Sequence, residues 1–426
     1  MTQIIGILLA FSLIIILVNK KVSLGYALIV GSIIVGIFSG LGFLGISKTF
    51  FSAIIDPVTI RLVVVLALIG VLGSTMQKLN VLNRLVSSLN KLLKSPKLTI
   101  SVIPSIMGTL LVTGGAVMAA PLVDEIGEDL NLSKSKKAAI NLIFRHGWYF
   151  IYPLMPTFIL MAETASINKF DIIKLQWPLT LAMIVSGYLL WIHPAKIKDN
   201  IKDKLTKEKA SKADIRQLII SSSPLWVSLS LALILEQVNF VTLGLSAGAA
   251  KLLTQMAFPI ALCLGILIAL VIGDKTEKSI TQTILKGISP SIILSGIGIM
   301  IFKAMVGKLT VLNDLVIHFL DTGIPLFVIF ITLPWLTGFL SASATSAIGI
   351  TLPLLLPALA LSPNPIPLVM LMYCSAFIGY LISPLHLCQV LTLEYFKVKI
   401  SELYKEYIIV IPLTFVVSLV VYFLVR

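Results

Sequence analysis

The sequence TGFLSASATSAIGIT occupies residues 337–351, in a segment without a charged residue between Asp321 and Glu394. A serine or threonine in an apolar helix often bonds back to the carbonyl four residues earlier, which accounts for one or two such side chains. This stretch carries more, on several faces and between two glycines: Ser341, Ser343, Thr345, Ser346 and Thr351. We therefore predict that these hydroxyls line a polar cavity at membrane depth, with unwound backbone beside them.

The composition places the whole chain in a membrane. It is 58% hydrophobic and 12% charged, with a mean hydropathy of +1.04, whereas soluble domains carry about 25% charge. Apolar segments such as 175–192 and 408–425 approach the ~20 residues that a helix needs to cross a bilayer. Lipid cannot satisfy backbone polar groups, so these segments are expected to be helices. We expect a multi-pass protein of the cell membrane, in contact with the lipid bilayer.

The charges and cysteines exclude other classes. The net charge of +14 comes from basic residues in loops, where they set topology, so we expect no nucleic-acid partner. The three cysteines, Cys263, Cys374 and Cys388, lie in apolar stretches without metal-ligand spacing, and we predict that they are packing residues. We expect no bound metal and no cofactor apart from a coupling ion.

Basic residues also predict a hairpin. Residues 78–97 and 134–145 are both rich in Lys and Arg, as is the loop 195–217, and the positive-inside rule places all three in the cytoplasm. The only apolar segment between the first two is 98–123, which must then enter and leave the membrane on one side. Proline and glycine interrupt it, as expected for a re-entrant hairpin.

An internal repeat gives the architecture. Residues 78–86 read KLNVLNRLV and residues 308–316 read KLTVLNDLV, with seven identities in nine; the alternative is chance among Leu-rich helices. An odd number of spans separates the copies if 98–123 is re-entrant and 240–272 crosses once, so the halves are inverted; two crossings would make them parallel. Inverted repeats with broken helices are typical of secondary transporters.

We therefore predict an all-α polytopic membrane protein of about ten spanning helices plus two re-entrant hairpins in two inverted repeats. The expected parts are N-terminal spanning helices (1–57), a first repeat (58–194) with broken segment 98–123, a basic cytoplasmic linker (195–217), connecting helices (218–287) and a second repeat (288–426) with broken segment 324–360.

The first repeat supplies substrate-binding candidates at its glycine-rich break, Thr113, Gly114 and Gly115. Exposed amides at such a break bind carboxylates, although small residues also simply permit close helix packing. Arg145 is either a counter-charge for an anion or an interfacial anchor. Next to it, His146 is a candidate proton carrier or a hydrogen-bonded core residue.

The second repeat supplies the matching residues. Ser341, Ser343, Thr345 and Ser346 are the substrate-binding candidates of the broken segment. Ser383, His386 and Gln389 follow at spacings of three, along one helical face. We predict that Ser383 binds substrate and that Asn141, His146, His386 and Gln389 take part in proton or ion coupling; interhelical hydrogen bonding is the alternative. Arg61 is expected to be a snorkelling residue.

Three stretches, NLIFRHGWYFIYPLMP, LLVTGGAVMAAPLVDEIG and LISPLHLCQVLTLEYF, resemble domain of unknown function family 401, which is similar to the gluconate, citrate and dicarboxylate permeases of the ion transporter superfamily. The resemblance covers most of the chain. It implies two inverted repeats with re-entrant hairpins, a scaffold and a transport domain, a homodimer and an elevator motion. The Ser-Asn-Thr motifs of sodium-coupled dicarboxylate members are absent, so substrate and coupling ion do not carry over.

These features predict a secondary active transporter, or permease, for a small organic anion such as a carboxylate or sugar acid. Alternating access would be driven by H+ or Na+, as in a symporter. A passive channel or an exporter shares the same broken helices and stays open as an alternative. An enzyme, such as an intramembrane hydrolase, is not expected because no H-E-x-x-H motif occurs.

Overall fold

The computed structural model describes residues 2–93, 95–109, 115–198, 211–274, 280–311, 314 and 321–426. Within these ranges the chain is helical and has no strand, which confirms the predicted all-α class. Seven described helices are long and apolar enough to cross a membrane: α1 (Thr2–Asn19), α4 (Pro57–Lys78), α10 with its π-helical end (Lys169–Ile192), α12 (Lys212–Gln237), α13 (Ala247–Ile272), α19 together with α20 (Ile366–Phe396) and α21 (Ile400–Val425). The chain is therefore a multi-pass membrane protein.

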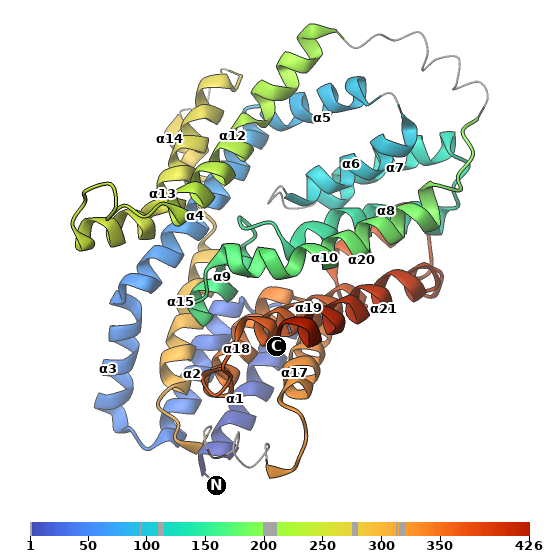
Figure 1. The fold of residues 1–426 in the computed structure, drawn as a ribbon. Coiled ribbons are helices and arrows are strands. Elements are labelled where there is room, and N and C mark those ends of the chain that lie inside the picture. Colours follow the sequence, from blue (N-terminus) through green and yellow to red (C-terminus); the bar gives the residue numbers. More distant parts are fainter. Residues whose placement is uncertain are drawn as a thin grey trace.

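One bundle, on the left in Figure 1, combines the first five helices with four from the middle of the chain. Its members besides α1, α4, α12 and α13 are α2 (Leu24–Ser39), α3 (Gly42–Ile55), α5 (Val81–Leu92), α14 (Ile280–Leu285) and α15 (Pro290–Val306). Helix α15 packs closely on α2 because glycines face each other. A Cβ atom on Gly298 would lie 2.7 Å from the carbonyl oxygen of Gly25.

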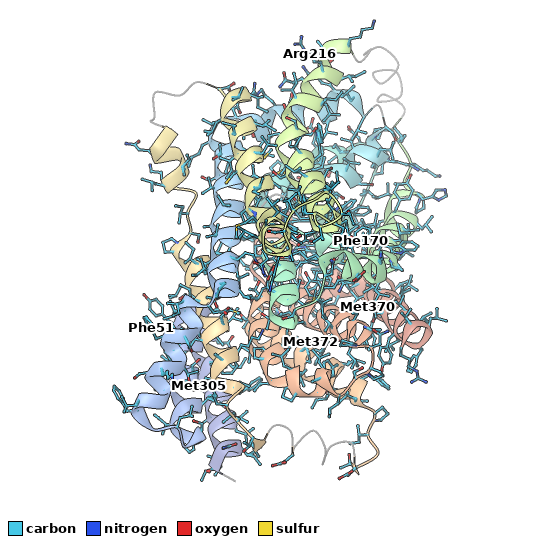
Figure 2. The ribbon with its side chains drawn as sticks, turned by 60° about the vertical axis from the view of Figure 1, so that its left-hand side comes forward. Phe51, Phe170, Arg216, Met305, Met370 and Met372 are labelled. Carbon is cyan, nitrogen blue, oxygen red and sulfur yellow. The ribbon has the colours of Figure 1, made fainter. Side chains whose placement is uncertain are left out.

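The second bundle contains the remaining helices, on the right in Figure 1. Its members besides α10, α19 (Ile366–Ile382), α20 (Leu387–Phe396) and α21 are α6 (Pro96–Thr109), α7 (Gly115–Asp129), α8 (Lys134–His146), the 3-10 helix η1 (Gly147–Phe150), α9 (Pro156–Ala165), α17 (Leu326–Ser341) and α18 (Ala344–Ala360). Figure 2 shows Phe51 and Met305 in the first bundle and Met370 and Met372 of α19 in the second. The bundles meet where α15 contacts α18 and α4 contacts α9.

Three helix breaks shape the second bundle. Between α17 and α18, Ala342 adopts a left-handed conformation with φ +50°. Between α19 and α20 the helix stops at residues 383–386, which include Pro384. The third break divides residues 134–165 into two helices, α8 and α9, which are joined by η1 and residues 151–155. Pro153 and Pro156 lack the N–H that a continuous helix would use there.

Candidate functional site

A cavity of about 390 Å³ lies between the two bundles, beside the break of the second broken segment. The first bundle supplies apolar side chains and the hydroxyls of Ser291 and Ser295. The second bundle supplies Pro156, Leu160, Ser343, Thr345 and Ser346. Three of the hydroxyl residues singled out in the sequence, Ser343, Thr345 and Ser346, therefore line a cavity.

The remaining hydroxyls of the segment are bound within their own helices. Ser341 Oγ donates to the Thr337 carbonyl oxygen over 2.6 Å, and Thr351 Oγ1 donates to the Ala347 carbonyl oxygen over 2.7 Å. These two residues follow the back-bonding alternative that the sequence left open.

Two helices begin at this cavity. Ser343 caps α18, its Oγ accepting from the Ser346 N–H over 3.1 Å, and α9 starts at Pro156. The hydroxyls of Thr157 and Thr345 hydrogen-bond over 2.6 Å and hold the two helix starts together. Helix N-termini carry partial positive charge and unpaired amides, so this end of the cavity favours an anion. Thr157 was not among the sequence candidates, because nothing local marks it as a partner of residue 345.

A second polar cluster lies at the end of α8 and the start of α20. His146 and His386 are both buried, and their ring centroids lie 5.0 Å apart. The ring of Tyr380 lies 4.1 Å from that of His386, and Tyr149 lies 5.5 Å from His146. The two predicted coupling histidines, from different halves of the sequence, are therefore neighbours.

Three further predicted residues, Asn141, Ser383 and Gln389, make hydrogen bonds within the second bundle. Asn141 Nδ2 donates to Thr392 Oγ1 over 3.1 Å, and Gln389 Nε2 donates to the Ser383 carbonyl oxygen over 3.1 Å. Ser383 Oγ donates to the Phe339 carbonyl oxygen over 2.7 Å. Their hydrogen bonds are the interhelical kind that the sequence could not separate from a role in transport.

Arg145 is also inside the protein. Its exposed fraction is 9%, and its Nη1 atom has no hydrogen-bond partner among the described residues. A buried guanidinium is costly unless an anion or acceptors pair with it. Arg145 therefore lies in the protein interior, but it is not among the residues that line the cavity between the bundles.

One of the cysteines lies beside this cluster. The Sγ atom of Cys388, a predicted packing residue, and one ring nitrogen each of His146 and His386 lie within 4.8 Å of one another. Spacing along the chain could not show this, because His146 is distant in sequence from the other two.

A family model described as protein of unknown function (DUF401) matches residues 4–209 and 253–425. The chain belongs to the DUF401 family. This confirms the resemblance read from the sequence. No curated protein matches the chain.

In this DUF401 member, part of the first-half site lies outside the described residues, namely Thr113 and Gly114. Gly115, the third candidate there, is the first residue of α7. In the first broken segment α7 therefore begins at Gly115, and in the second α18 begins at Ala344.

A network of four charged residues joins the bundles of the DUF401 chain. Glu163 of α9 pairs with Arg61 of α4, and Lys169 at the start of α10 pairs with Glu163 over 2.9 Å and with Glu236 of α12 over 3.0 Å. The network borders a second cavity, of about 270 Å³. Arg61 is therefore an interior ion-pair partner, and its prediction as a snorkelling residue was wrong.

One further motif has a structural role. The sequence GLSAG at residues 244–248 matches G-x-S-x-G, the pattern of a hydrolase nucleophile elbow. Here Ser246 caps α13, its Oγ accepting from the Ala249 N–H over 3.3 Å. A nucleophile elbow instead follows a strand, whereas α12 and a turn precede Ser246.

Proposed function

We propose that this DUF401 member is a secondary active transporter for a small organic anion, such as a carboxylate or sugar acid, with alternating access driven by H+ or Na+. The observation that carries the proposal is the cavity between the bundles, where α9 and α18 both begin and where Ser343, Thr345 and Ser346 present hydroxyls. Amides at helix starts and hydroxyls are the groups that hold a carboxylate in a broken-helix transporter.

The contacts of α6 and α7 support a re-entrant hairpin. Lys97 Nζ, at the start of α6, donates to the His193 carbonyl oxygen over 2.6 Å. Just after α7, Asn131 Nδ2 donates to the Lys196 carbonyl oxygen over 3.3 Å. Both ends of the α6–α7 pair thus lie against the segment that follows α10, as expected when they leave the membrane on one side.

The α17–α18 pair shows the same arrangement against the end of α21. At the start of α17, the ring of Phe327 lies 5.5 Å from that of Tyr422. Just after α18, Asn364 Nδ2 donates to the Val425 carbonyl oxygen over 2.9 Å. This contact pattern supports a second hairpin that enters and leaves at one end of α21.

The order of the elements supports two repeats. Helix α6 starts at Pro96 and α17 at Leu326, while α10 starts at Lys169 and α21 at Ile400. These separations agree with the offset between KLNVLNRLV at 78 and KLTVLNDLV at 308. On this basis the first bundle is the scaffold and the second is the transport domain. The elevator motion and the homodimer come from the resemblance to the ion transporter superfamily.

Arg145 is the proposed counter-charge for the substrate because its buried guanidinium has an unpaired Nη1 atom, although Arg145 does not itself line the cavity. The coupling role of Asn141, His146, His386 and Gln389 stays a prediction. A small dicarboxylate or sugar acid fits a cavity of about 390 Å³, which is within the size range of small-molecule sites.

The test begins with purified protein and a panel of carboxylates and sugar acids. A substrate that binds the folded state raises the unfolding temperature, and the rise grows with the substrate concentration. The compound found is then used for counterflow in proteoliposomes, where unlabelled substrate inside accelerates uptake of labelled substrate. Acceleration supports a carrier, whereas uptake without acceleration indicates a passive channel and refutes the proposal.

A further inference from the structure

The cluster of His146, His386 and Cys388 has the composition of a metal site. Two imidazoles and a thiol are the ligands preferred by soft or borderline transition metals. Their ligand atoms lie within 4.8 Å of one another, while three ligands bound at about 2.0–2.3 Å to one ion lie about 3.5–4 Å apart. Side-chain adjustments on the order of 1 Å would close the site.

The hydrogen bonds of His146 leave one of its ring nitrogens available to bind a metal ion. Its Nδ1 atom lies 2.8 Å from the carbonyl oxygen of Leu142, an acceptor that places the ring proton on Nδ1. The lone pair is then on Nε2, whose contact with Tyr380 Oη is long, at 3.3 Å. A second hydrogen bond that fixes the tautomer and the ring orientation is the usual arrangement of a metal-ligating histidine.

His386 supplies the second, independent observation. The residue is 1% exposed, and neither of its ring nitrogens has a hydrogen-bond partner among the described residues. Buried polar atoms without partners are rare and costly in folded proteins. An ion bound to one of these nitrogens would remove that cost, and it would be shared with the Cys388 thiolate two residues later.

We propose that His146, His386 and Cys388 form a binding site for a soft monovalent metal ion, Cu+. The thiol of Cys388 loses its proton on binding, so the thiolate and Cu+ together are neutral, and the copper does not change its oxidation state. A Zn²⁺ ion with the same ligands would leave a net positive charge next in sequence to buried Arg145, which is unfavourable at low dielectric. This copper site does not depend on the proposed transport function.

Bound copper would join the end of α8 to the start of α20, which lie at two of the three helix breaks of the second bundle. Rings of Tyr149 and Tyr380 pack around the histidines, and both imidazoles are buried. The histidine pair that the sequence predicts to carry protons is, in this proposal, a pair of metal ligands.

The experiment uses the full chain in detergent with Cys263→Ser, because Cys263 is an exposed thiol and thiols are ligands for Cu+. Cu+ is titrated without oxygen in competition with a coloured Cu+ chelator. We expect one Cu+ per chain, and at least a tenfold weaker affinity in His386→Ala and in Cys388→Ser. His193→Ala removes an exposed histidine and serves as the matched control, with unchanged affinity.

A second measurement keeps the test independent of folding defects. The unfolding temperature without metal identifies any variant that is unstable, and X-ray absorption at the copper edge reports the ligands directly. One sulfur and two nitrogen neighbours support the site. Binding that is absent, equal in Cys388→Ser, or weaker than that of Zn²⁺ overturns the proposal.

Discussion

Removal of the Glu163 carboxylate is expected to destabilise the protein strongly. Glu163 is the ion-pair partner of Arg61 and shares Lys169 with Glu236. The side chains of Glu163, Arg61 and Lys169 are 11%, 18% and 8% exposed, so all three charges are largely shielded from bulk solvent. Loss of one partner of a buried ion pair costs about 3–5 kcal/mol. Because Lys169 keeps Glu236, we expect Glu163→Ala to cost about 3 kcal/mol, the lower end of that range.

The assay is reversible unfolding in mixed detergent micelles, which reports the free energy of unfolding of each variant. Glu406→Ala is the matched control, since Glu406 accepts one hydrogen bond, from Ser135 over 2.7 Å at a partly exposed position; this bond is worth about 1.5 kcal/mol, the lower end of the range for a charged acceptor. Adding Arg61→Met to Glu163→Ala removes the stranded charge and recovers part of the loss. Equal losses in Glu163→Ala and Glu406→Ala would refute the reasoning.

Three further predictions follow from the fold and the site. Ser343→Leu fills the cavity between the bundles and should abolish the carboxylate-induced rise in unfolding temperature. The control, Thr332→Leu on the exposed face of α17, should keep this rise. A retained rise in Ser343→Leu would show that residues 337–351 are not part of the binding site. Gly379→Ala places a Cβ atom 2.1 Å from the Trp335 carbonyl oxygen, so α17 and α19 must separate at a cost of about 1–3 kcal/mol. Gly248→Ala, with open space around it, is the control. An equal loss in the free energy of unfolding for both variants would contradict the close packing of α17 on α19. Lys137, through its hydrogen bond and charge, lowers the pKa of Glu128 from 4.5, so the carboxylate stabilises the fold above about pH 4.5 and loses this effect as the pH falls through its folded pKa. The unfolding temperature should therefore fall less on acidification in Glu128→Gln than in the unaltered protein. Parallel pH profiles of the two proteins would exclude this contribution of Glu128 to stability.

The sequence predicts those features of the fold that depend on local pattern. Apolar length and loop charge indicate a multi-pass helical protein, and glycine with a run of hydroxyls marks the break at Ser343. Features that depend on distant partners were missed. Arg61 reads as an anchor until α9 brings Glu163 to it, and Pro153 alone does not show where α8 ends.

The site follows the same division. The pattern identifies Ser343 and Thr345, because their hydroxyls stand out in an apolar segment. It gives no signal for Thr157, whose partner lies in the other half of the chain. Cys388 is joined to His146 only by the packing of α20 on α8, which spacing along a single chain does not encode.

The proposed architecture has two inverted halves, and each half has a hairpin that enters and leaves the membrane on one side. Single cysteines at positions 80, 131, 310 and 364, in a chain with Cys263, Cys374 and Cys388 replaced by serine, test it with a membrane-impermeant thiol reagent applied from each side. With two inverted halves, positions 80 and 131 are labelled from the cytoplasm and positions 310 and 364 from outside. Labelling of 80 and 131 from opposite sides would show that the α6–α7 segment crosses the membrane, and would contradict the account.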